Sequence, residues 1–205
     1  KTGLPTRRIE SWHYTDLRTL LRGLPEGAGT SSIVEPLVAG SSVLVLEDGV
    51  ALGGKGPDGV TVSTIAGKLE DGSFANALGA RGFDDTVGQI STSLVSDGYH
   101  LAVADEAELA KPFEIQVLAG AGSHTRLAVN IGKGAKLTLV ERHPDADSFV
   151  SAVSNVVVGD GAEGGEVDGL VDVRLCATGR AQQRVGRQRH AGEGHVGHAL
   201  AVDGA

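Results

Sequence analysis

The sequence has little of several residue types, and each shortage argues against a class of protein. A single cysteine cannot form an intrachain disulfide, so no disulfide framework supports the fold. Lysine and arginine number 18 against 26 acidic residues, and the net charge of −8 argues against non-specific binding of nucleic acid. No apolar run approaches the roughly 18 residues of a transmembrane helix, so no membrane partner is expected. Without a signal-peptide pattern at its start, the chain is expected in the cytoplasm.

Aromatic residues are also scarce, at 3%, whereas 31 residues are glycine and 40% are hydrophobic. Glycine adopts the positive φ angles that tight corners require. Small aliphatic residues can fill the space between closely stacked strands. The composition therefore favours stacked strands with glycine corners. The glycines have no three-residue period, which excludes a collagen triple helix.

A short pattern recurs in the second half of the chain: an apolar residue, a small residue, two turn-forming residues and alanine. Copies occupy residues 103–107, 131–135 and 158–162, and a weaker fourth begins at Val185. The small residues of successive copies lie 28, 27 and 27 positions apart, at Ala104, Gly132, Gly159 and Gly186. A fixed period of this size is typical of a stacked architecture. The units lack helical periodicity, so the pattern predicts a β-solenoid with Gly132 and Gly159 one above the other.

Other segments carry local signals. Strands are expected in residues 43–46, 59–65 and 136–142, where β-type residues form short runs. Leucines at positions 17, 20, 21 and 24 predict one amphipathic helix, and residues 73–96 have room for one or two more. Residues 26–42 are rich in Gly, Ser, Ala and Thr and are expected to form a linker.

The opening of the chain resembles the start of the SufD family. The shared residues are Gly3-Leu4-Pro5-Thr6-Arg7-Arg8, followed by Glu10, Trp12, Tyr14, Thr15 and Leu17. His13 stands where the family usually has lysine. A second resemblance, to SufD and SufB, covers residues 97–118 and continues through 140–143 and 154–158. The resemblance decays after about residue 164, so the chain is expected to be truncated, divergent or read in a shifted frame from there.

The repeat and the resemblance together imply a mainly β fold. We expect a parallel β-helix (β-solenoid) core over residues 97–205, preceded by a small helical and α+β N-terminal segment over residues 1–96. SufD is a subunit of the SUF iron–sulfur cluster assembly machinery. The resemblance therefore implies a non-catalytic scaffold subunit that pairs with SufB and docks the SufC ATPase. The iron–sulfur cluster would belong to the assembled complex, with no cofactor on this chain. The C-terminal coils are expected to associate with a second copy or a SufB-like partner.

Two other classes of function stay open. One is a stand-alone β-helix binding module that uses the acidic surface. The other, less favoured, is a β-helix enzyme such as an acyltransferase or a polysaccharide lyase. Hexapeptide acyltransferases have a much shorter repeat, and the charged cluster that a lyase needs is not evident in the sequence. Lys55 lies in a glycine-rich stretch that lacks the spacing of a phosphate-binding loop, so the chain is expected not to bind ATP.

Several residues are of types that can form sites, but the sequence assigns none a catalytic, cofactor-binding or metal-binding role. Cys176 lies between apolar residues and is expected to be a small buried side chain. His190, His195 and His198, with Glu193 nearby, lack a recognised metal-ligand spacing and are expected in a solvated tail. His143 and Asn155 are expected to cap corners or form asparagine ladders. Trp12 and Tyr14 are expected to anchor the N-terminal helix by packing.

Overall fold

The structure is a computed structural model. It describes residues 31–73, 86–118, 123–144, 149–159, 174–177 and 195–202, together with Leu4, residues 6–8 and Arg22. Only the backbone is described for residues 174–177 and 195–202. The predicted helix at residues 17–24 lies outside the described part, apart from Arg22.

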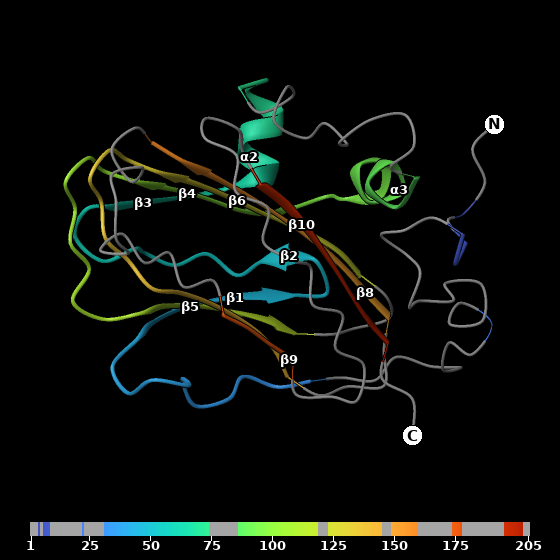
Figure 1. The fold of residues 1–205 in the computed structure, drawn as a ribbon, viewed down its shortest axis with the longest axis horizontal. Coiled ribbons are helices and arrows are strands. Elements are labelled where there is room, and N and C mark those ends of the chain that lie inside the picture. The colour runs from blue at the N-terminus through green and yellow to red at the C-terminus, as the bar shows by residue number, and fades with distance from the viewer. Residues whose placement is uncertain are drawn as a thin grey trace.

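Two five-stranded sheets face each other in this part of the chain (Figure 1). Sheet A has the order β2-β1-β5-β7-β9 and sheet B the order β10-β8-β6-β4-β3. The strands of sheet A are β1 (Ser42–Glu47), β2 (Val50–Ala51), β5 (Phe113–Leu118), β7 (Leu139–His143) and β9 (Arg174–Ala177). Those of sheet B are β3 (Val60–Thr64), β4 (Gly98–Val103), β6 (Ser123–Ile131), β8 (Phe149–Val158) and β10 (His195–Val202).

Successive strands from β4 to β9 alternate between the two sheets, so that each sheet pairs its strands in parallel. Residue 98 pairs with residue 126 across β4 and β6, and residue 123 with residue 150 across β6 and β8. These offsets match the spacing of the repeated turns. The repeat therefore sets the register of sheet B.

The repeated turns stack on one another where the chain leaves the strands of sheet B and passes to sheet A. The spacing predicted this stacking for Gly132 and Gly159. The Gly132 N–H donates to Val103 O at 2.9 Å, and the Gly159 N–H donates to Ile131 O at 2.7 Å. A Cβ atom on Gly132 would lie 2.5 Å from the backbone nitrogen of Asp105. Only glycine lets successive turns approach this closely.

The predicted fold class, a mainly β protein with a parallel β-helix core, is wrong for the described residues. The structure is mixed α/β, and its two sheets are open. β2, β3 and β10 all pair antiparallel with their neighbours, so the parallel pairing stops at both edges of sheet B and at one edge of sheet A. The periodic spacing specifies the register between adjacent central strands. It carries no information about the strands that flank them. The fold class predicted from this spacing is wrong for that reason.

Apolar side chains fill the space between the sheets. Alternate residues of each central strand point inward, because a strand has a side-chain period of two. The buried cluster includes Leu44, Leu46, Leu101, Ile115, Leu127, Val129 and Leu139. The strands β1 and β3, which precede residue 97, complete this core by pairing with β5 and β4.

Each sheet also has a cover on its outer face. Helices α2 (Ile65–Glu70) and α3 (Thr86–Leu94) contact sheet B, and Ile65 packs with Ala128 of β6. Residues 31–41, drawn in blue in Figure 1, run beside sheet A without forming a helix or strand. The predicted linker is thus a packed segment in the part that is described.

Most local predictions agree with the structure. The expected strands at residues 43–46 and 59–65 correspond to β1 and β3, and α3 lies within the region expected to be helical. The run at 136–142 becomes a strand only from Leu139, since Lys136 forms an isolated bridge with Glu108 at the turn. Helix α2 was not anticipated, although Thr64 caps it by accepting a hydrogen bond from the Gly67 N–H at 3.2 Å.

Candidate functional site

A polar cluster interrupts the apolar layer between the sheets. It consists of Glu141 and His143 on β7 and Ser154 on β8. Leu139 and Ala152 each lie two residues earlier on these strands and belong to the core. Because side chains alternate along a strand, Glu141 and Ser154 face the same interior layer.

The carboxylate of Glu141 joins the two sheets. Ser154 Oγ donates a hydrogen bond to Glu141 Oε2 at 2.8 Å, and His143 Nε2 lies 2.9 Å from Glu141 Oε1. Glu141 is 2% exposed, and the His143 side chain is 13% exposed. Both carboxylate oxygens therefore have a polar partner although the group is buried. A buried charge is tolerated only with such partners.

The environment of Glu141 acts on its pKa in opposite directions. Burial raises the pKa, whereas the hydrogen bond and charge of His143 and the hydrogen bond from Ser154 lower it. The lowering contributions prevail, so the pKa of Glu141 lies below its ordinary value. Glu141 is accordingly ionised at neutral pH and acts as a hydrogen-bond acceptor between the sheets.

The order of the three groups limits the chemistry that they can support. In a serine–histidine–acid triad the imidazole lies between the hydroxyl and the carboxylate. Here Glu141 lies between Ser154 and His143, so the hydroxyl proton points at the carboxylate. The cluster therefore connects strands of the two sheets through hydrogen bonds, and it lacks the arrangement in which an imidazole activates a serine.

The same three residues match the ligands of an iron–sulfur cluster poorly. Such clusters are held chiefly by cysteine thiolates, whereas this site offers a carboxylate, an imidazole and a hydroxyl. Across the described part of the chain, no group of three His, Cys, Asp or Glu residues is placed to hold a metal ion. We therefore assign no described residue to hold a cluster.

Tyr99 forms a second polar connection between the sheets. Its hydroxyl, on β4, lies 3.0 Å from Val45 O and 2.6 Å from Gly53 O, both of which belong to the sheet A side of the core. Burial raises the pKa of Tyr99 above its ordinary value. The hydroxyl therefore stays protonated and serves as a donor. Tyr99 and Glu141 thus have related roles on opposite sheets.

The candidate residues from the sequence lie in different parts of the structure. Asn155 lies inside β8 and pairs with Ala128, so its expected corner or ladder role is wrong. His143 is the last residue of β7, where its side chain contacts Glu141. Cys176 is on β9, and His195 and His198 are on β10, where only the backbone is described. Lys55 lies in the loop between β2 and β3. His190, Glu193, Trp12, His13 and Tyr14 lie outside the described residues.

Sequence reasoning missed Glu141. A signal was present, because the alternation that places Leu139 in the core also places Glu141 and His143 on the same face of the strand. Two polar residues at inward positions predict a polar contact with the facing sheet. The identity of the facing residue, Ser154, depends on how the two sheets are aligned and could not be read locally.

Comparison with protein-family models finds no match. Comparison with curated proteins finds no match either. Neither of the described helices α2 and α3 has the length and hydrophobicity that crossing a membrane would require.

Proposed function

We propose that this protein is a non-catalytic scaffold subunit for iron–sulfur cluster assembly, acting in the cytoplasm. It would pair with a SufB-like subunit and dock a SufC-like ATPase, and the cluster would be the product of the assembled complex. The observation that carries the proposal is the resemblance to SufD at residues 3–17 and 97–118.

The described architecture is compatible with a scaffold role. The second region of resemblance, residues 97–118, forms β4 and β5, one from each sheet. Asp97 links segments on both sides of the core, because its carboxylate accepts hydrogen bonds from the Ala51 N–H at 3.0 Å and the Ala66 N–H at 2.9 Å. Buried polar groups that join separate segments favour a rigid framework.

The direct test is co-purification of the full chain with SufB-like and SufC-like proteins. The tagged chain should retain both partners through size-exclusion chromatography at micromolar concentration. ATP hydrolysis should require the SufC-like subunit. Anaerobic addition of iron and sulfide should then produce cluster absorption in the complex and not in this chain alone.

Two exposed apolar residues allow the contact surface to be mapped. Leu94 lies on α3 beside sheet B, and Leu52 follows β2 of sheet A. A change to aspartate at the position that contacts a partner should abolish retention, and the other variant serves as the matched control. Failure of the unmodified chain to retain either partner, or ATP hydrolysis by the chain alone, would overturn the proposed function.

A further inference from the structure

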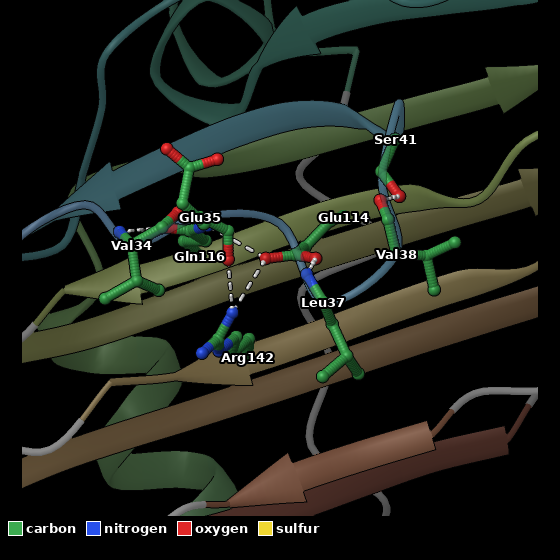
Figure 2. A network of polar contacts seen from close by, with 8 residues as sticks. All are labelled: Val34, Glu35, Leu37, Val38, Ser41, Glu114, Gln116 and Arg142. Carbon is green, nitrogen blue, oxygen red and sulfur yellow. Dashed lines mark hydrogen bonds and ion pairs between the residues drawn. The ribbon is translucent and has the colours of Figure 1, made fainter.

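The segment that covers sheet A, residues 31–41, is here named the strap. It crosses the outer face of sheet A and then turns back into β1 (Figure 2). In this turn the Ser41 N–H donates to Val38 O at 3.1 Å, and Gly40 has a φ of 80°. The strap is therefore joined to the sheet that it covers by only a few residues.

Gln116 of β5 contacts the strap in the manner of a neighbouring strand. The Val34 N–H donates to Gln116 Oε1 at 3.0 Å, and Gln116 Nε2 donates to Val34 O at 2.8 Å. One carboxamide thus satisfies both main-chain groups of a single residue. This donor and acceptor pair is the one that an extended backbone presents to any partner.

Two charged residues, Glu114 and Arg142, bind the strap backbone at the residues that follow Val34. The Leu37 N–H donates to Glu114 Oε2 at 2.7 Å, and Arg142 Nη1 donates to Glu35 O at 2.6 Å. The anchors also contact each other, since Gln116 Nε2 donates to Glu114 Oε1 at 2.8 Å and Arg142 Nη1 lies 3.8 Å from the same oxygen. Figure 2 shows these side chains converging on the strap backbone.

Two of the three anchors are buried and the Arg142 side chain is 19% exposed, whereas many strap side chains are open to solvent. Glu114 and Gln116 are 0% exposed. Ile33, Leu37 and Val38 are 60%, 49% and 44% exposed, so the sheet makes little use of them. All four hydrogen bonds from the anchors end on main-chain atoms of the strap. Recognition of this kind depends on an extended backbone more than on its sequence.

We propose that the outer face of sheet A, built from Glu114, Gln116 and Arg142, is a binding site for an extended peptide backbone, and that it also accepts the strap of a second copy of this chain. The strap itself is the ligand that the structure shows, so a second strap has the required chemistry. The tether through residues 38–41 gives the chain's own strap a high effective concentration. Exchange between copies therefore becomes visible when that strap is weakened. The proposal is independent of the proposed function.

Complementary variants of the full chain test the exchange. Leu37→Pro removes the N–H group from which Glu114 accepts a hydrogen bond and leaves the binding face intact. Gln116→Leu disables the face and leaves the strap intact. Tagged Leu37→Pro should capture at least about five times as much untagged Gln116→Leu as untagged Leu37→Pro. Only the first mixture combines an intact binding face, on Leu37→Pro, with an intact strap, on Gln116→Leu. Tagged Leu37→Ala, which keeps the N–H, is the matched control and should show background capture.

Equal capture in all combinations would overturn the exchange between copies. Thermal melts confirm that each variant is folded. Should Gln116→Leu fail to fold, Gln116→Glu replaces it, because a carboxylate keeps the side-chain size and cannot donate to Val34 O.

A synthetic peptide of residues 31–38 tests backbone recognition separately, with fluorescence anisotropy on the Leu37→Pro chain. A peptide carrying Ile33→Ser, Leu37→Ser and Val38→Ser should bind within about threefold of the original, and one N-methylated at Val34 and Leu37 should bind about tenfold weaker or worse. Absence of binding, or equal binding of the N-methylated peptide, would overturn backbone recognition. Peptide binding without capture between full chains would overturn the second copy as ligand.

Discussion

The two outer faces of this molecule are covered in different ways. On sheet B, helix α2 buries Ile65 against Ala128, with Leu69 and Val95 packed alongside. On sheet A, the strap leaves many of its side chains in solvent and is held by buried polar groups such as Gln116. The helical cover of sheet B is held by burial of apolar side chains, and the strap on sheet A is held by directed hydrogen bonds.

The difference follows from what each cover can offer a sheet. A helix satisfies its own backbone internally, so it binds through side chains, and burial of one large aliphatic side chain contributes about 1.5–3 kcal/mol. An extended segment has unsatisfied N–H and C=O groups, which the sheet must pair if it is to cover them. Hydrogen bonds contribute about 0.5–1.5 kcal/mol each, and more when a charged group takes part. The strap should therefore be more sensitive to substitutions that remove a hydrogen-bonding group. The helix should be more sensitive to substitutions that shorten a buried apolar side chain.

The largest effect should come from the helix side. Ile65→Ala removes a side chain that is completely buried between α2 and sheet B. We expect the free energy of unfolding to fall by about 2–5 kcal/mol, from lost burial and the cavity that remains. Urea denaturation measures the change. Val38→Ala on the strap is the matched control, and it should stay within about 0.5 kcal/mol because Val38 is 44% exposed and lies outside the buried core. Equal losses at both positions would remove the distinction between the covers.

Glu114→Ala should have the next largest effect, and it should act on the strap. The change leaves the Leu37 N–H without its acceptor and deprives Arg142 and Gln116 of a shared partner. We expect a loss of about 1–3 kcal/mol. Hydrogen exchange should quicken at Val34 and Leu37 and stay unchanged in α2. Leu37→Ala keeps the amide and is the control. Faster exchange in α2 as well would show that the two covers are coupled.

Glu141→Gln tests the polar connection that lies between the two covers. The folded-state pKa of Glu141 lies below its ordinary 4.5, so its stabilising contribution is complete above about pH 4.5 and is lost as the pH falls through the folded-state value. At neutral pH the variant should lose about 1–2 kcal/mol from the weakened contacts with His143 and Ser154. In acid the difference from the unmodified chain should shrink. A difference that is constant from pH 7 to below 4.5 would contradict this titration.

The periodic and local features of this fold could be predicted from the sequence. Gly132 and Gly159 repeat at the spacing that sets the register of sheet B. The predicted strand at 43–46 lies within β1, and the predicted strand at 59–65 contains β3. Each of these signals lies within one strand or one turn. Pairing direction is different, because the antiparallel strands at the sheet edges depend on partners that the local sequence does not specify.

The two polar features at the sheets were harder to foresee. The strap composition predicts only a linker, and its anchors lie far away in sequence: Leu37 and Glu114 are 77 positions apart, and Glu35 and Arg142 are 107 apart. Glu141 and His143 carry a local signal in their alternation, but Ser154 comes from the facing sheet. Contacts of this kind follow from the stacking of the sheets and not from any pattern in one segment.

The smallest effect should come from an exposed ion pair, and it isolates burial as the deciding factor. Lys136 Nζ lies 2.8 Å from Glu108 Oε1, the same distance that separates Gln116 from Glu114. The Lys136 and Glu108 side chains, however, are 55% and 68% exposed. Lys136 lowers the pKa of Glu108 by hydrogen bonding and by its charge, but water screens such pairs, and exposed pairs contribute little to stability. Lys136→Ala should therefore leave the urea midpoint unchanged within error, with and without added salt. A loss as large as that of Glu114→Ala would show that the short donor–acceptor distance decides the contribution to stability and that burial does not.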